Sequence, residues 1–426
     1  MYISQQLAAN AVNQVLGGRN LTATLEDIFR EHYDITPQQR ATAQDLSYGT
    51  LRFYGRLQGL LAQLLEKPLQ DTRAQCLLLV ALYQLCYDTA AQHTVVDQAV
   101  KAATGLNKPW AKGLVNAVLR NFLRRRDVLN QALAQNEVAT YSYPQWWINK
   151  LKNQYPQNWQ SILEAGNQHP PMTLRVNQRM ISADDYCLKL AEQGIAAQKM
   201  ANITVILAKP MPVDKLPGFY EGEVSVQDYG AQFAAELLDV ADGLRVLDAC
   251  CAPGGKTGHI LELADVNLVA LDNDAGRLQR VQANLDRLKL KASLVVGDAS
   301  DNKHWWDGVP FDRILADVPC TASGIVRRHV DIKWLRREAD IASFAAQQAL
   351  ILQGLWQLLA KGGKLLYATC SIFHEENQRQ VDNFLALHAD AAQLPLMHTQ
   401  HEQLQRGQLS PSAEHDGFFY ALLQKN

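Results

Sequence analysis

The sequence predicts a multidomain protein with an all-α N-terminal domain, a small α+β middle domain and a C-terminal α/β domain built on a doubly wound sheet. Apolar residues recur at helical spacing over roughly the first 140 residues, and the composition changes near residue 142. From about residue 228, short apolar runs alternate with helical patterns. We therefore expect domains at residues 1–140, 141–227 and 228–426, which a chain of 426 residues can accommodate.

The composition is that of a globular protein, with 47% apolar and 20% charged residues and a formal net charge of −2. This charge gives no overall attraction to nucleic acid, so RNA binding would need local basic patches. The seven cysteines include no C-x-x-C pair, which argues against a zinc ribbon and favours a reducing cytoplasm. The N-terminus shows no signal-peptide pattern, and the longest apolar stretch, Cys76–Tyr87, is too short to span a bilayer. We expect a cytoplasmic monomer with no metal site and no membrane association.

Apolar spacing in the N-terminal region predicts helices over Leu21–His32, Tyr48–Leu65 and Ala74–Cys86. Residues 108–126 carry six basic side chains, no acidic one, and an apolar stripe at helical spacing. This pattern predicts a packed helix with a basic rim, which either contacts nucleic acid or is only a solvated face. The basic residues are Lys108, Lys112, Arg120, Arg124, Arg125 and Arg126, and the stripe is Val115, Val118, Leu119 and Phe122.

The middle and C-terminal regions alternate strand and helix patterns. In the middle region we expect strands at Met172–Asn177, Ile203–Leu207 and Glu223–Gln227 and a helix at Ala183–Gln193. The expected C-terminal strands are Arg245–Asp248, Leu268–Asp272, Ser293–Gly297, Asp312–Asp317, Lys364–Thr369 and Phe418–Leu423. The expected C-terminal helices are Lys256–Ala264, Ala275–Leu288, Ile341–Leu359 and Glu375–His388.

A glycine-rich turn joins the first C-terminal strand to its helix, over residues 246–257. Its glycines let the backbone approach a ligand closely, and the helix N-terminus favours negative charge. Gly255-Lys256-Thr257 also matches the end of a P-loop, whose first glycine would fall at Cys250, and the strand ending at Asp317 could supply the acid. A nucleoside triphosphatase therefore stays open.

Three successive strands end at or beside an acid, at Asp248, Asp272 and Asp298. An acid at the end of the second strand can accept hydrogen bonds from vicinal ribose hydroxyls. The order of these acids indicates a cofactor that contains adenosine. It does not separate a dinucleotide from S-adenosylmethionine.

Two cysteines close apolar runs, Cys320 after 313–319 and Cys370 after 364–369. Reactive groups of open α/β sheets gather at the carboxyl ends of the strands, so both thiols are expected there. A single cysteine is usually a small buried apolar residue. Two cysteines in equivalent positions favour covalent catalysis, because a thiolate is a strong nucleophile near neutral pH.

The chain resembles the RNA 5-methylcytosine methyltransferases over about its last 200 residues. The resemblance lies in Asp248-Ala-Cys-Cys-Ala-Pro-Gly-Gly-Lys-Thr257, Asp317-Val-Pro-Cys320 with Thr321-Ala-Ser-Gly324, and Tyr367-Ala-Thr-Cys370-Ser371 with Glu375-Glu-Asn377. The helical N-terminal region is similar to the NusB fold. This fusion resembles bacterial methyltransferases of small-subunit ribosomal RNA, and it implies a Rossmann-like catalytic domain and 16S ribosomal RNA as the partner. Cys251 and Val318 stand where family members usually have alanine.

The resemblance implies S-adenosylmethionine as the cofactor and methylation of cytosine C5. It implies that Cys370 attacks C6 of the base, that Cys320 assists release, and that Asp317 binds the base near N3. From its place in the glycine loop, we also expect Lys256 to help position the adduct. The implied cofactor contacts are Asp272 on the ribose, Asp298 near the adenine, Asp317, and the loop of Cys250, Cys251, Ala252, Pro253, Gly254, Gly255 and Lys256.

Alternatives remain for the thiols and for the whole chain. DNA cytosine-C5 enzymes attack with the Pro-Cys residue, which would exchange the roles of Cys320 and Cys370. The chain could also be an RNA-binding assembly or antitermination factor with an inactive catalytic domain. Residues 327–337 carry five basic side chains and one acid, so we expect RNA contact there, with Trp334 as a stacking surface.

Overall fold

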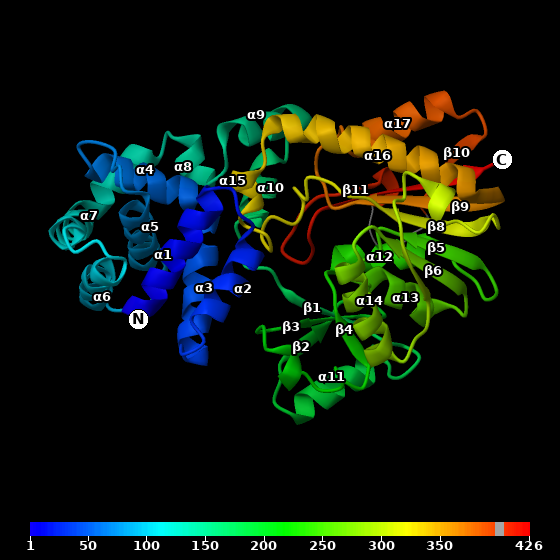
Figure 1. Cartoon of the computed structure of the whole chain (residues 1–426), viewed down its shortest axis with the longest axis horizontal. Coiled ribbons are helices and arrows are strands. Elements are labelled where there is room, and N and C mark those ends of the chain that lie inside the picture. The colour runs from blue at the N-terminus through cyan, green and yellow to red at the C-terminus, as the bar shows by residue number, and fades with distance from the viewer. Residues whose placement is uncertain (397–403) are drawn as a thin grey trace. The chain divides into compact units, whose positions relative to one another are not determined.

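A computed structural model describes residues 1–396 and 404–426 of the chain. It forms two compact units, each described here by itself (Figure 1). Unit 1 comprises residues 1–168 and 326–338, and unit 2 comprises residues 169–325 and 339–426. Among the described residues, no helix combines the length and the apolar character needed to cross a bilayer.

Unit 1 is built from helices, as the sequence predicts. The apolar helix α5 lies at its centre and begins at the N-cap Asp71, whose carboxylate accepts from the backbone N–H of Ala74. The helices are α1 (Tyr2–Leu16), α2 (Leu21–Glu31), α3 (Pro37–Arg52), α4 (Tyr54–Leu64), α5 (Thr72–Tyr87), α6 (Gln92–Gly105), α7 (Ala111–Leu133), α8 (Glu137–Tyr141), α9 (Gln145–Gln154), α10 (Trp159–Ala165) and α15 (Ile332–Leu335).

The prediction of one helix over Tyr48–Leu65 is wrong, because α3 ends at Arg52 and α4 begins at Tyr54. The residue between them, Phe53, stacks its ring on Tyr87 with centroids 4.1 Å apart. A side chain on Gly55 would come within 2.5 Å of the carbonyl oxygen of Val138. Tertiary packing therefore causes the break between α3 and α4, and no glycine or proline at residue 53 indicates it in the sequence.

Helix α7 has the predicted amphipathic form. Val115, Val118, Leu119 and Phe122 are buried, and the rim residues Lys112, Arg120, Arg124 and Arg125 are exposed. Contact of this rim with nucleic acid stays a prediction.

The segment 326–338 belongs to unit 1, and the expected RNA stacking on Trp334 is wrong. The indole packs against the apolar core of unit 1 and donates from Nε1 to the carbonyl oxygen of Leu51 at 2.7 Å. Lys333 is completely buried and donates to the carbonyl oxygens of Arg52 and Ser142 at 2.7 and 3.0 Å. Lys333 therefore supplies hydrogen-bond donors to buried backbone carbonyls.

The first part of unit 2 is the small α+β module that the sequence predicts. Its four strands form an antiparallel sheet in the order β2-β3-β1-β4. The elements are β1 (Met172–Val176), α11 (Ala183–Glu192), β2 (Ala197–Lys199), β3 (Thr204–Leu207), the 3₁₀ turn η1 (Val213–Lys215) and β4 (Val224–Val226).

The rest of unit 2 is a doubly wound α/β fold, which confirms the predicted class. Strands β7, β6, β5, β8 and β9 are parallel. Strand β12 pairs antiparallel with β9, and both β10 and β11 pair antiparallel with β12. The strands are β5 (Arg245–Ala249), β6 (Asn267–Asp272), β7 (Ser293–Val296), β8 (Phe311–Asp317), β9 (Leu359–Thr369), β10 (Ala391–Leu394), β11 (Gln408–Leu409) and β12 (Phe418–Lys425). The helices are α12 (Tyr229–Leu237), α13 (Gly255–Leu263), α14 (Ala275–Leu288), α16 (Glu338–Leu358) and α17 (Gln378–Leu387), with 3₁₀ turns η2 (Asn302–His304) and η3 (Leu404–Arg406).

Helices cover both faces of this sheet (Figure 1). Val246 packs with α12, α13 and α14, and the next residue, Leu247, packs with α16 and α17. This alternation follows from the two-residue period of a strand. Because both faces are covered, the carboxyl ends of the parallel strands are the place where polar side chains can gather.

Candidate active site

The two predicted cysteines meet at the carboxyl ends of β8 and β9. These strands pair in parallel with Asp317 opposite Ala368, so the loops that follow them start side by side. The Sγ atoms of Cys320 and Cys370 lie 3.3 Å apart, although the residues are 370 − 320 = 50 positions apart in the chain. The structure thus brings together two thiols that the sequence could place only at equivalent strand ends.

The two thiols differ in burial. Cys320 is buried and Cys370 is half-buried. The hydrogen bond with Cys370, burial, and the charges of Cys370 and Glu376 raise the pKa of Cys320 well above its ordinary value. Cys320 is therefore a neutral thiol near neutral pH, and it can donate a hydrogen bond to a thiolate at Cys370.

Lys256 and Asp317 form an ion pair beside the thiols. Lys256 Nζ lies 2.5 Å from Asp317 Oδ2, and it also lies over the ring of Phe418, 5.7 Å from its centroid. Burial lowers the pKa of Lys256, but the charge of Asp317 and the hydrogen bond to it raise the pKa more, so its net value lies above the ordinary one. Lys256 is therefore an ammonium, and it does not act as a base here.

The loop from Cys250 to Gly255 turns sharply between β5 and α13. Cys250 has φ +61° and Gly254 has φ +93°, and a Cβ on Gly254 would lie 3.0 Å from Val281. Burial raises the pKa of Cys250 to about 12, and burial also raises the pKa of Cys251. Both thiols therefore stay protonated near neutral pH.

A cavity of about 210 Å³ lies at the ends of β5, β6 and β7. Asp272 lies on its wall, almost wholly buried, and accepts from the backbone N–H groups of Ala252 and Asp274 at 3.1 Å each. Asp298 also lines the cavity; it accepts from Ser300 in the turn after β7. The other lining residues are Cys250, Leu271, Asn273, Arg277, Gly297, Ala299, Ser300, Pro319, Gln347 and Ile351.

This lining fits an adenosine-containing cofactor. A carboxylate at the end of the second strand can accept from ribose hydroxyls, and the apolar side chains of Leu271 and Ile351 can contact a base. Pro319, which precedes Cys320, belongs to the same wall. The cofactor cavity and the thiols are therefore neighbours.

Asp248, on β5, is completely buried behind the loop. Thr257 donates to its Oδ2 at 2.6 Å, and its Oδ1 has no hydrogen-bond partner among the described residues. Burial raises the pKa of Asp248 to about 7. Asp248 therefore helps to hold the first turn of α13 and does not line the cavity.

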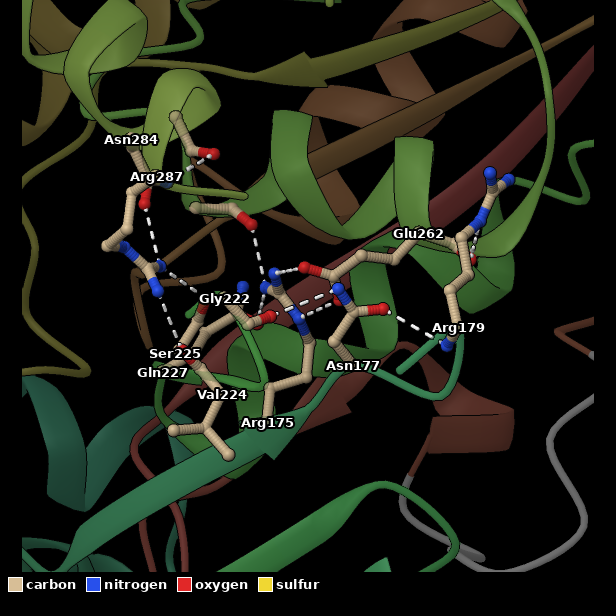
Figure 2. Close-up of polar contacts among 12 residues, drawn as sticks. Arg175, Asn177, Arg179, Gly222, Val224, Ser225, Gln227, Glu262, Asn284 and Arg287 are labelled. Atoms are coloured by element: carbon tan, nitrogen blue, oxygen red, sulfur yellow. Dashed lines mark hydrogen bonds and ion pairs between the residues drawn. The ribbon is translucent and has the colours of Figure 1, made fainter. Parts of the chain in front are cut away.

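Arg175 is a site-supporting residue that the sequence reasoning missed. It is completely buried on β1 and forms two hydrogen bonds to the carboxylate of Glu262 on α13, at 2.9 and 2.7 Å (Figure 2). Its Nη1 donates to Gln227 at 2.5 Å and to the carbonyl oxygen of Gly255 at 2.8 Å. The signal was one arginine within an otherwise uncharged strand, Met172–Val176.

Glu376 is the second residue that was missed. We expected it inside a helix over Glu375–His388, but α17 begins at Gln378. Its buried carboxylate instead accepts hydrogen bonds from the loops that follow the two cysteines. The signal was the motif Glu375-Glu-Asn377, which carried part of the resemblance but gave Glu376 no role. Spacing alone gave no sign of this role, because a glutamate at a helix start is common.

Family models match all three predicted regions. The model described as 16S rRNA methyltransferase RsmB/F matches residues 235–424, a Methyltr_RsmF/B-like ferredoxin-like domain matches residues 143–214, and the NusB family matches residues 3–124. These matches confirm the NusB-like helical domain and identify the middle module as ferredoxin-like.

A solved structure named PH0851 has a TM-score of 0.80 at 24% identity, covering 100% of this chain and 99% of that one, which shows the shared fold. A methyltransferase homolog protein from Pyrococcus horikoshii has a TM-score of 0.59 at 28% identity, with 68% of this chain and 97% of that one covered.

Named relatives match over their full length. The ribosomal RNA small subunit methyltransferase B of Pseudomonas putida is 46% identical, covering 98% of this chain and 97% of the relative. The protein of the same name from Serratia proteamaculans is 43% identical, covering 100% and 99%. The chain therefore belongs to the 16S rRNA methyltransferase RsmB/F family of S-adenosylmethionine-dependent enzymes.

Proposed function

We propose that this protein methylates C5 of a cytosine in 16S ribosomal RNA through a covalent bond between Cys370 and C6 of the base. The observation that carries the proposal is the 3.3 Å approach of the Cys320 and Cys370 sulfur atoms. C5 of cytosine is a poor nucleophile, but addition of a thiolate at C6 converts the ring into an enamine whose C5 can attack an electrophilic methyl group. S-adenosylmethionine supplies that methyl group.

The two thiols have different roles because both cannot ionise at once. While Cys370 is a thiolate, its charge keeps Cys320 protonated. Once the Cys370 sulfur is bonded to C6 it carries no charge, so its contribution to the raised pKa of Cys320 disappears and Cys320 loses its proton more readily. The Cys320 thiolate can then take the proton from C5 of the methylated ring, and the ring expels Cys370 as a thiolate.

Asp317 and Lys256 bind and orient the cytosine and take no part in the chemistry at the sulfur atoms. The ion pair uses Asp317 Oδ2, so Oδ1 can accept a hydrogen bond from the cytosine near N3. Lys256 fixes the direction of that carboxylate. In the cofactor cavity, Asp272 would bind the ribose hydroxyls and Asp298 would lie near the adenine.

The target base must leave its stack to reach the thiols, so the RNA is unpaired there or the base flips. Family membership accounts for Gly255-Lys256-Thr257, and we do not retain the nucleoside triphosphatase interpretation. We also propose action in the cytoplasm, where ribosomal RNA is made.

Cys370→Ala and Cys320→Ala should fail at different stages. We expect Cys370→Ala to form no covalent protein–RNA species, because the nucleophile is gone. Cys320→Ala should accumulate that species, because release of the methylated base is slowed. The measurement is a denaturing gel of protein incubated with small-subunit RNA and S-adenosylmethionine, with Cys187→Ala from the middle module as the control.

The opposite gel pattern would assign the attack to Cys320, as in DNA cytosine-C5 enzymes. The absence of 5-methylcytosine from both deproteinised RNA and small-subunit particles would favour the RNA-binding factor instead. Mapping 5-methylcytosine in RNA from cells with and without the protein would identify the nucleotide.

A further inference from the structure

One buried carboxylate joins the two loops that carry the thiols. Glu376 Oε1 accepts from the backbone N–H of Thr321 at 2.8 Å, and its Oε2 accepts from the Thr321 hydroxyl at 2.5 Å. Oε2 also accepts from the hydroxyl of Ser371 at 2.5 Å. Thr321 follows Cys320 directly and Ser371 follows Cys370 directly. One side chain therefore binds the residue next to each cysteine.

A third element is bound to the same carboxylate. Gln348 on α16 donates from Nε2 to Glu376 Oε1 at 3.2 Å and to the carbonyl oxygen of Pro319 at 2.9 Å. The peptide carbonyl of Glu376 accepts from the Tyr367 hydroxyl at 2.7 Å, which ties the residue back to β9. The residues on both sides of Cys320 are therefore anchored, directly or through Gln348, to Glu376.

We propose that Glu376 is a positioning residue that sets the separation of the Cys320 and Cys370 sulfur atoms by binding both cysteine loops to one buried carboxylate. A buried carboxylate is costly unless its hydrogen bonds are made, so the loops are held where their donors reach it. This inference deepens the proposed function, and only the catalytic purpose of the sulfur separation rests on that function. The position of the sulfur atoms is measured without RNA or methyl transfer.

The test is the rate at which phenylarsine oxide bridges the two thiols. This reagent bonds one arsenic atom to two nearby sulfur atoms and releases water, and peptide mass mapping locates the bridge between Cys320 and Cys370. We expect Glu376→Gln to slow bridging about tenfold or more, because the amide nitrogen cannot accept from the loop donors. Loss of the Glu376 charge alone would lower the pKa of Cys320 and speed the reaction, so slower bridging reports geometry.

The matched control is Asp382→Asn. Asp382 is a carboxylate of α17 that accepts from Gln378 on the same helix, and its loss should leave bridging unchanged. Affinity for S-adenosylhomocysteine should also stay unchanged in Glu376→Gln, because Glu376 does not itself line the cavity and Gln348 still bonds the carbonyl oxygen of the lining residue Pro319. A purely structural role would weaken both properties together.

Bridging in folded Glu376→Gln at a rate within about twofold of the unaltered protein would overturn the proposal. If that variant does not fold, Gln348→Met decides, since it removes one link at nearly constant volume. We then expect bridging to slow about threefold, and an unchanged rate would refute the proposal. Failure of cytosine methylation with normal bridging would count against the proposed function and not against the role of Glu376.

Discussion

The carboxyl groups at the ends of β5, β6 and β8 have different environments, and these environments decide what each can do. Asp317 is paired with Lys256, Asp272 accepts from two backbone N–H groups, and Asp248 has one oxygen with no partner among the described residues. Asp248 therefore bears a cost when it ionises. Burial raises its pKa to about 7, and the charge of Asp317 adds to this.

Asp248→Asn should make the protein less sensitive to pH. Because the pKa of Asp248 is higher in the folded state than its ordinary 3.8, the folded state binds more protons between about pH 4 and pH 7, and stability falls as pH rises through that window. From pH 5 to pH 8, the unaltered protein should lose about 2–3 kcal/mol of unfolding free energy relative to the variant. Urea unfolding at both pH values measures this, and a constant difference would contradict it.

At the scale of residues, the sequence predicted the candidate reacting groups but not their hydrogen-bond partners. Cys320, Cys370, Asp317 and Lys256 were predicted from motifs, and the structure brings all four to one place. The role of Glu376 could not be predicted, because its hydrogen bonds run to loops 5 and 55 positions away in the chain. Side-chain hydrogen bonds over such separations leave no periodic pattern.

At the scale of elements, hydrogen bonds join strand β1 to helix α13, although β1 belongs to one sheet and α13 packs on the other. Arg175 links the ferredoxin-like module to the carbonyl oxygen of Gly255, the residue before Lys256. Arg287 on α14 reinforces this link by donating to the carbonyl oxygens of Phe219 and Val224 and to the Ser225 hydroxyl. The middle module therefore supports the start of helix α13.

Arg175→Lys should weaken cofactor binding, because a lysine cannot reproduce the paired bonds to Glu262 or reach three partners at once. We expect affinity for S-adenosylhomocysteine to fall about tenfold and unfolding free energy to fall by about 2 kcal/mol. Isothermal calorimetry measures the first and urea unfolding the second.

The control for Arg175→Lys is Arg179→Lys. Arg179 belongs to the same module as Arg175 and is partly exposed. It donates to the carbonyl oxygen of Glu262 and forms an ion pair with Asp265. An equal effect of both variants would mean that the Gly255 contact has no special role.

Element boundaries were predicted where periodicity decides them and not where packing does. Helix α14 was predicted to the residue, at Ala275–Leu288. The break at Phe53 and the late start of α17 were not predicted, because aromatic stacking and the Glu376 hydrogen bonds override a continuous helical pattern. Short edge strands such as β2 and β10 lack the apolar runs that identify a strand.

For the whole molecule, a nearly neutral chain must bind a polyanion through local charge. The exposed rim of α7 is the strongest predicted patch that the structure leaves exposed. Residues 327–337 do not provide a second one through Trp334 and Lys333, which pack inside unit 1. Composition could not separate these two basic segments, because a buried cation and a solvated one have the same sequence signature.

Changing Arg124 and Arg125 together to glutamate should weaken binding of small-subunit RNA about tenfold at moderate salt and leave S-adenosylhomocysteine binding unchanged. Filter binding at several salt concentrations measures the affinity and its salt slope. The control changes Arg73 and Lys101 to glutamate, two exposed basic residues of unit 1 outside the 108–126 segment. An equal loss of RNA affinity in the control would mean that the change in net charge, and not the rim of α7, causes the effect.

The chain enters unit 1 twice, because residues 326–338 rejoin the helices after the Cys320 loop. Val330, Trp334 and Leu335 complete a core whose other residues lie within the first 139 positions. During synthesis, the helices emerge from the ribosome long before this segment does, so unit 1 stays incomplete until most of unit 2 has been made. Truncation at one point cannot separate the two units. A fragment that begins at residue 169 would retain Trp334 and Lys333 without the unit 1 helices against which they pack.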